Sequence, residues 1–372
     1  MSWFPTTLDS GEQSWRFDIV SLLAVIGGST IEKHKQSITA SPFAGFPRLL
    51  PAPDTLLDTD RPIRLPSVGD VVIIGIYSGT RTNELNFFAN VIHDAESLAP
   101  YEFRSYNITY ATPDIEKEDA AKTEINIPVR TLSALNGVTV LSILMTVGLF
   151  VWAGVIHDGV ALVGLFSMSL STSTACLSGQ WRPRLSKRPT GGRVPPGDLV
   201  IKTRGGAFIV VHCREEITRE LYAGMDTCQY VFTGRPHQLL LASSTVLLMA
   251  SIILFSNCGR TMQIAVGVVY IILNILYWAM ALLTSPQHTW DMRRYRVEET
   301  QSVQTGNYTE VLWRAIRDTG EIKWVKKGDL APATKYWKGW LKEAQDNCKN
   351  ENWDAVAAKN RWMNKAVEEK QD

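Results

Sequence analysis

Two long apolar blocks constrain the fold of this chain more than any other feature. The first runs from Gly137 to Ser178 and contains no Lys or Arg, and the second runs from Leu239 to Thr284. Each block is about twice the ~20 residues that a helix needs to cross a bilayer. The first is interrupted by the polar turn at 157–159, and the second by a turn that carries Arg260. The pattern predicts two transmembrane helical hairpins, with four spans in total.

The alternative is a pair of buried helical hairpins in a large soluble protein. The mean hydropathy of -0.04 is typical of a soluble chain. That average hides the concentration of apolar residues in the two blocks, and four nearly uncharged spans favour the membrane. Residues 167–174 make the second span polar, but a packed membrane helix tolerates Ser and Thr whose hydroxyls bond their own backbone. We therefore expect a membrane α-helical fold with cytosolic α+β segments.

The distribution of basic residues predicts the orientation of the spans. Residues 178–238, between the hairpins, carry ten Lys or Arg and five Asp or Glu, whereas the opposite face has only Arg260. Cytosolic loops are enriched in Lys and Arg, so this loop and both termini are predicted to be cytosolic. The acidic balance of residues 1–136 does not contradict this orientation, because acidic residues contribute little to the rule.

The chain divides into five segments by composition. An acidic N-terminal region (1–130) is expected to be partly ordered α/β structure with a proline-rich linker at 42–66. The other segments are hairpin 1 (137–178), a basic cytosolic loop (179–238), hairpin 2 (239–284) and a tryptophan-rich cytosolic tail (285–372). Residues 18–30 are apolar but short, which favours a helix lying on the membrane or on the soluble part; a fifth span is the alternative.

Four stretches of the soluble segments predict strands. The β-branched run at 70–77 predicts a buried strand, and residues 86–92 are its predicted partner. In the middle loop, two apolar runs at 198–203 and 207–213 flank Gly205-Gly206 and predict a β-hairpin. A short helix is expected directly after it, because acidic residues begin that stretch and Gly224 ends it.

The tail holds seven of the twelve tryptophans of the chain. We expect helices at 309–320, 334–346 and 352–369, with a strand or turn at 321–327. A small helical unit with a tryptophan core is the favoured interpretation. Aromatic anchors at a lipid surface are an alternative, and nucleic-acid binding is not expected.

Candidate chemistry is sparse. His157 and Asp158, in the turn of the first hairpin, are the weak catalytic candidates, because an ionisable pair at a membrane edge can transfer protons; a water-exposed turn also simply prefers polar residues. The spans contain no Asp, Glu, Lys or Arg in mid-membrane, which argues against an ion-coupled pump. No metal-ligand or phosphate-binding motif occurs, so no metal and no cofactor is expected.

Three residues are candidates for modification. Cys176 lies at a predicted membrane edge and could carry a palmitate, although a buried thiol is the favoured alternative. Asn107 and Asn307 fit the glycosylation sequon. Both are cytosolic in the predicted topology, so they are expected to be unmodified unless they are lumenal.

Several stretches resemble a family of uncharacterised multi-pass membrane proteins of filamentous fungi. They are VPPGDLVIKTRGGAFIVVHCREEITRELYAG, VVYIILNILYWAMALL, HTWDMRRYRV, TEVLWRAIRDTG and WVKKGDLAPAT, within about residues 130–344. The resemblance implies a fungal membrane protein and supplies no catalytic residue. Some proteins of this kind are encoded beside secondary-metabolite genes, which implies only an association with that metabolism.

Three functions remain open on the sequence. The leading one is a non-enzymatic membrane scaffold or adaptor that binds a cytosolic protein. The second is a transporter or channel subunit, which would act as a homo-oligomer because four spans are few for a monomeric carrier. The third is a membrane-edge enzyme that acts on a lipid or terpenoid through His157 and Asp158.

Overall fold

The computed structural model describes residues 28–58, 61–112, 124–186, 195–224, 226–283, 289–350 and 352–368. The chain divides into two compact units, and each is assembled from three separate stretches. The helical unit comprises 1–63, 126–183 and 228–291, and the α/β unit comprises 64–125, 184–227 and 292–372. Parts of all three predicted soluble segments therefore belong to the α/β unit, whereas the first part of the N-terminal segment belongs to the helical unit. The stretch that could hold a fifth span lies mostly outside the described residues.

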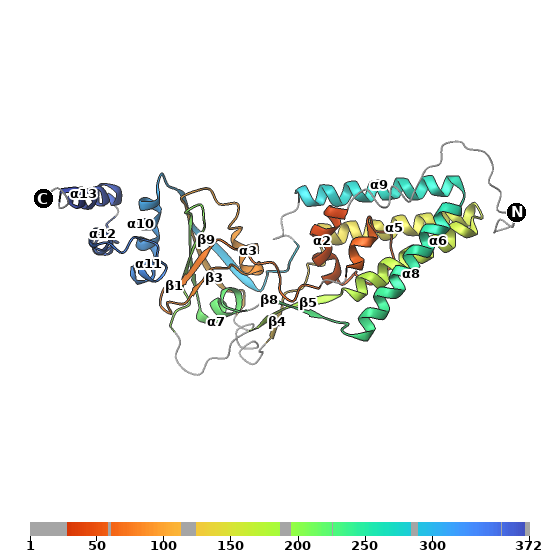
Figure 1. Ribbon diagram of the computed structural model, residues 1–372, viewed down its shortest axis with the longest axis horizontal. Helices are drawn as coiled ribbons and strands as arrows, with labels where there is room; N and C mark the ends of the chain where they lie inside the picture. Colours follow the sequence, from red (N-terminus) through yellow and green to blue (C-terminus); the bar gives the residue numbers. More distant parts are fainter. Residues whose placement is uncertain are drawn as a thin grey trace. The chain divides into compact units, whose positions relative to one another are not determined.

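The helical unit contains four helices that are long and apolar enough to cross a membrane (Figure 1): α5 (Ala134–Val155), α6 (Gly159–Ser178), α8 (Arg235–Asn257) and α9 (Arg260–Leu283). Their bounds agree with the predicted hairpins. Helix α6 is the most buried of the four. It packs along α8, where Ser171 Oγ donates to Ser244 O at 2.8 Å and Ser244 Oγ returns a bond to Ser171 O at 2.9 Å. The polar character of the predicted second span is thus used in helix packing.

A segment that follows helix α2 (Gly28–Ala40) and includes the turn η1 (Pro53–Leu57), residues 41–58, packs among these helices. We call it the inserted segment. Leu49 and Leu50 in it are fully buried. The extended linker predicted from its prolines is therefore wrong for this stretch, because the segment is part of the core of the helical unit.

The backbone of the inserted segment is bonded by side chains of the long helices. Leu49 N donates to Thr146 Oγ1 at 3.0 Å, and Leu49 O accepts from Ser142 Oγ. Nearer the start of α5, Ser41 Oγ donates to Asn136 Oδ1 at 2.7 Å. Asn136 and Thr146 lie ten residues apart, or about 15 Å along a helix axis. The segment thus follows α5 to the middle of its length.

The fully buried Arg48 supplies a second set of bonds inside this segment. Its Nη1 donates to Phe43 O at 2.8 Å and to Phe46 O at 3.2 Å, and its Nη2 lies 3.9 Å from Cys176 Sγ. A non-helical backbone is tolerated within protein only when its polar groups are paired. The guanidinium therefore supplies the hydrogen-bond donors that water supplies to the carbonyl groups of an exposed turn.

The α/β unit is built on a six-stranded sheet in the order β2-β1-β6-β7-β3-β9. Neighbours are antiparallel except β7 and β3, which are parallel. The strands are β1 (Val72–Gly75), β2 (Arg81–Thr82), β3 (Glu102–Tyr110), β6 (Leu199–Lys202), β7 (Phe208–Cys213) and β9 (Tyr295–Gln304). A smaller sheet has the order β4-β5-β8, from β4 (Glu124–Asn126), β5 (Trp181–Ser186) and β8 (Asp226–Tyr230).

The predicted β1 strand and the β6–β7 hairpin are confirmed. The predicted strand at 86–92 is wrong, because those residues form helix α3 (Phe87–His93). The expected short helix after the hairpin is present as α7 (Glu215–Ile217), which continues into η2 (Thr218–Tyr222).

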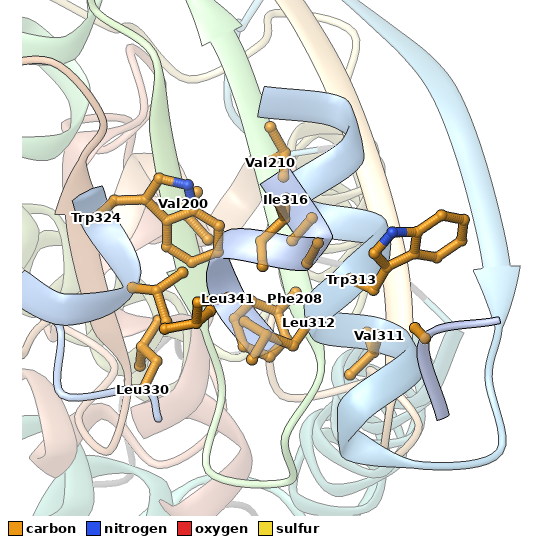
Figure 2. Close-up of a cluster of buried hydrophobic side chains, with 14 of the residues drawn as sticks. Val200, Phe208, Val210, Val311, Leu312, Trp313, Ile316, Trp324, Leu330 and Leu341 are labelled. Carbon is orange, nitrogen blue, oxygen red and sulfur yellow. The ribbon is translucent and has the colours of Figure 1, made fainter. Parts of the chain in front are cut away.

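The first two of the four tail helices contact strands of the six-stranded sheet, and the last two pack on the first. The four are α10 (Tyr308–Thr319), α11 (Lys323–Lys327), α12 (Lys335–Asp346) and α13 (Ala355–Glu368). Figure 2 shows Trp324, Leu312 and Ile316 against Val200, Phe208 and Val210 of the strands. Trp324 and Trp340 are fully buried in this cluster. The tryptophan core is confirmed, whereas the strand or turn predicted at 321–327 is wrong because α11 is helical.

A buried carboxylate joins all three stretches of the α/β unit. Glu220, from the middle loop, accepts from Arg294 Nε at 3.0 Å and from Tyr110 OH at 3.1 Å. Tyr295 OH also donates to it. Glu220 is fully buried, and its three partners come from the N-terminal stretch and from the tail. The sheet pairing is thus reinforced by a single side-chain network.

Candidate ligand-binding site

The two weak catalytic candidates lie in the turn between α5 and α6. Asp158 caps α6: its Oδ1 accepts from Ala161 N at 2.9 Å, and its Oδ2 accepts from Gly259 N at 2.7 Å. His157 has a left-handed backbone with φ of 58°. Both carboxylate oxygens of Asp158 are therefore engaged with backbone, and they link the turns of the two hairpins. This is a structural role that the sequence did not predict.

The three modification candidates lie in separate places. The Cys176 thiol is fully buried beside Arg48. Asn107 is an exposed residue of β3, and Asn307 caps α10 by accepting from Glu310 N at 3.0 Å. Whether any of them is modified stays a prediction.

Histidine 212 lies between two carboxylates. Its Nδ1 is 3.2 Å from Asp198 Oδ2, and its Nε2 is 3.0 Å from Asp318 Oδ2. The hydrogen bonds to these carboxylates raise the pKa of His212 to about 10. Ser105 Oγ donates to Asp318 at 2.8 Å, but Ser105 is fully buried and bonds the carboxylate rather than the imidazole. The cluster is therefore an internal ion-pair network, and it lacks the serine–histidine contact of a hydrolase.

A cavity of about 470 Å³ lies in the α/β unit. We call it the Asp226 cavity. Its walls come from the stretch before β1, the loop before α3, the end of η2 and the start of β8. The lining residues are Arg64, Leu65, Ser67, Thr82, Asn83, Glu84, Asn86, Phe87, Tyr222, Ala223, Gly224 and Asp226. A volume of this size suits a small ligand.

The carboxyl of Asp226 is the most distinctive group in this cavity. The residue is only 5 % exposed. Its Oδ2 accepts from Phe88 N at 3.3 Å, whereas its Oδ1 is buried and has no hydrogen-bond partner among the described residues. Burial penalises the ionised form and raises the pKa of Asp226 to about 7. The carboxyl therefore changes its protonation near neutral pH.

The wall beside Asp226 is held rigidly. Tyr222 OH lies 2.6 Å from Nε2 of His93, which is buried on α3. Burial lowers the pKa of His93 to about 3, so the imidazole is neutral at pH 7. Asn86 Nδ2 donates to Leu221 O at 2.9 Å and to Gly224 O at 2.8 Å. These bonds fix the end of η2 over the cavity and leave little side-chain entropy to be lost on binding.

The outer part of the cavity carries both signs of charge. Arg64 and Glu84 are exposed there, and Ser67 Oγ donates to Glu84 Oε2 at 3.4 Å. The aromatic ring of Phe87 supplies an apolar surface. Together with the inner carboxyl, this lining can hold a hydrogen-bond donor or an ammonium group deep in the cavity and an uncharged body outside it.

Sequence analysis did not identify Asp226. The cavity is formed by residues 64–67, 82–87 and 222–226, and the last stretch is more than a hundred residues from the first two, so no local spacing reveals it. Within the described ranges, no group of three or more His, Cys, Asp or Glu side chains is placed to hold a metal ion. No family model, curated protein or solved structure matches this chain.

Proposed function

We propose that this protein is a non-enzymatic, multi-pass membrane scaffold whose α/β unit binds a small amine at the Asp226 cavity. The observation that carries the proposal is the buried Asp226 carboxyl with one unpaired oxygen in a preformed cavity of about 470 Å³. A buried carboxylate oxygen without a partner is costly. A ligand that donates an N–H to it removes that cost, so the cavity favours such a ligand over water-soluble anions.

The proposed topology has four spans and a cytosolic α/β unit. Support comes from β3, β7 and β9, which lie in one sheet. In the sequence, two of the long helices lie between β3 and β7, and the other two lie between β7 and β9. Strands can pair only on one side of a bilayer, and an even number of spans between them satisfies this condition. The excess of Lys and Arg between the hairpins favours the cytosolic side.

The binding experiment uses 2-phenylethylamine as the probe, because its ammonium group matches Asp226 and its ring matches Phe87. Titration calorimetry on the purified full-length chain should detect binding of the amine and much weaker binding of 2-phenylethanol. Asp226→Asn should lose the preference for the amine. Equal affinity for the two probes, or an unchanged preference in the variant, would refute an amine site at Asp226.

The topology is tested separately. Tags on each terminus should both be accessible to protease in sealed microsomes, and no endoglycosidase shift should occur at Asn107 or Asn307. A glycosylated Asn107 would place β3 in the lumen and reject the cytosolic α/β unit. The adaptor role would be supported if the intact chain reproducibly captures a protein partner from a detergent extract. That binding should be lost when the sheet of the α/β unit is unfolded.

An acid–base enzyme is the second candidate, and the raised pKa of Asp226 is the observation that favours it. General bases work best when their pKa lies near the working pH. Turnover of a bound amine substrate that is abolished by Asp226→Asn, with binding retained, would favour this candidate over the scaffold.

A further inference from the structure

A second cavity, of about 400 Å³, lies in the helical unit where α6 ends and α8 begins. We call it the interface cavity. It is bounded by α2 and by Asp58, Arg61 and Pro62. Leu56 lies on its apolar side, while Arg61 and Lys35 contribute positive charge. Two helices that are long enough to cross a membrane have an end here, so in a bilayer the cavity would lie near the level of the head groups.

Arginine 61 is fixed at one wall of this cavity. Its Nη1 donates to Phe232 O at 2.7 Å, and its Nη2 donates to Ser178 O. The guanidinium lies 4.6 Å from the centre of the Tyr230 ring. Its Nε is buried and has no hydrogen-bond partner within the described part of the chain. The guanidinium is therefore held in place, and its Nε–H lacks an acceptor within the described part of the chain.

The lining of the cavity also contains charges of both signs. Lys35 Nζ lies 3.3 Å from Asp58 Oδ2, and the side chains are 24 % and 55 % exposed. Glu32 precedes Lys35 by three residues, so the two share a face of α2. The cavity thus presents two cations and two carboxylates. This balance matches a ligand that carries both a phosphate and an ammonium group better than it matches a simple anion.

Aromatic residues complete the cavity. Trp181 is almost fully buried, and its Nε1 donates to Gln36 O at 3.1 Å and to Thr39 Oγ1 at 3.0 Å. Trp and Tyr are enriched at the level of lipid head groups, because their rings are apolar and their polar ends are wet. Trp181 is a buried wall of the cavity, and Tyr230 supplies a second ring beside it.

We propose that the interface cavity binds the head group of a zwitterionic phosphodiester, with its phosphate near Arg61 and Lys35 and its ammonium near Glu32 and Asp58. This chemistry occurs in a bilayer phospholipid and in the water-soluble glycerophosphocholine. The site is independent of the Asp226 cavity. It requires only that the end of α6 and the start of α8 lie at a membrane surface.

The experiment is native mass spectrometry of the full-length chain, released from micelles that contain equal amounts of phosphatidylcholine and phosphatidylglycerol. We expect preferential retention of phosphatidylcholine. Lys35→Gln and Glu32→Gln should each reduce that retention by about tenfold, the size expected for a partly desolvated charge. Arg182→Gln is the matched control, because Arg182 is exposed, lies beside Trp181 and does not line the cavity.

Arg61 is not used as the test residue, since its bonds to Ser178 and Phe232 make a folding defect expected. Thermal unfolding of each variant checks that the fold is retained. Competition by glycerophosphocholine would identify the free head group as sufficient, whereas retention without such competition would identify the bilayer lipid. Equal retention of the two lipids, or no effect of either variant, overturns the proposal. Asp226→Asn should leave retention intact, which separates this test from that of the proposed function.

Discussion

Glu220 and Arg294 form an ion pair in the α/β unit, with 3.0 Å between Glu220 Oε1 and Arg294 Nε. The carboxylate side chain is fully buried, and that of the arginine is 17 % exposed. One residue belongs to the middle loop and the other to the tail, and Tyr110 of the N-terminal stretch bonds the same carboxylate. The pair therefore holds together parts of the chain that lie far apart in the sequence.

Glu220→Ala should destabilise the α/β unit strongly, because it removes the buried carboxylate that Arg294 and two tyrosine hydroxyls bond. Removing one member of a buried pair costs about 3–5 kcal/mol. Chemical denaturation of the full-length chain, followed by tryptophan fluorescence, measures the loss. Glu298→Ala is the control, since its partner Arg296 is 70 % exposed and such surface pairs contribute under about 1 kcal/mol. Similar losses in the two variants would contradict the structural role of Glu220.

Thr146→Val tests the inserted segment. The substitution keeps the shape of the side chain and leaves the buried Leu49 N–H without its acceptor, which costs about 1–3 kcal/mol. Thr245→Val on α8 is the control, because Thr245 Oγ1 bonds only its own helix at Leu241 O. Thermal unfolding in detergent should show a clear loss for the first variant and little change for the second. Equal behaviour of the variants would mean that residues 41–58 are not packed against α5.

The His212 network predicts a stability that declines at alkaline pH. The folded pKa is about 10, above the ordinary value of 6.5. The contribution is fully present below about pH 6.5, and it is lost as the pH rises through 10. Unfolding free energies of the natural chain and of His212→Gln should therefore differ most below pH 6.5 and converge toward pH 10. A constant difference across this window would show that the imidazolium is not stabilised by Asp198 and Asp318.

The raised pKa of Asp226 predicts that the unfolding free energy depends on pH between about 4 and 7. The unfolded carboxyl ionises near its ordinary pKa of 3.8, whereas the folded one retains its proton up to about pH 7. Its contribution to stability is present below pH 3.8 and is lost as the pH rises through 7. Asp226→Asn removes this loss, so its stability relative to the natural chain should increase between pH 4 and pH 7. Glu84→Gln, on the exposed side of the same cavity, should show no such trend. A flat difference for Asp226→Asn would contradict the burial of an uncompensated carboxyl.

The four long helices could be predicted because length and apolar composition are enough to define a span. The hairpin of β6 and β7 was equally clear, since Gly205-Gly206 separates two apolar runs. The helix α3 was missed because a short run such as Asn86–Ile92 fits a strand and a buried helix equally well. Tertiary packing against the Asp226 carboxyl, from another part of the chain, selects the helix.

The inserted segment could not be predicted for a different reason. Its prolines are typical of an extended linker. The side chains that hydrogen-bond its backbone come from helices much further along the chain. Ser142 and Thr146 are about 95 residues further along the chain, and Ser173 Oγ bonds Gly45 O from α6. The Asp226 cavity shares this property. In both places the chemistry depends on residues brought together by the fold, so inspection of neighbouring residues does not reveal it.

The position of β3 between β7 and β9 in the sheet has a consequence for biosynthesis. Strand β3 ends at Tyr110, and its second partner, β9, does not begin until Tyr295. At ribosomal rates of about 5–20 residues per second, β3 waits roughly 10–40 s for that partner. During this interval, all four long helices are made, and both edges of β3 start without a neighbour. The sheet therefore closes only after the four long helices have been made, and a chaperone that shields open strand edges should associate with the nascent chain in that interval.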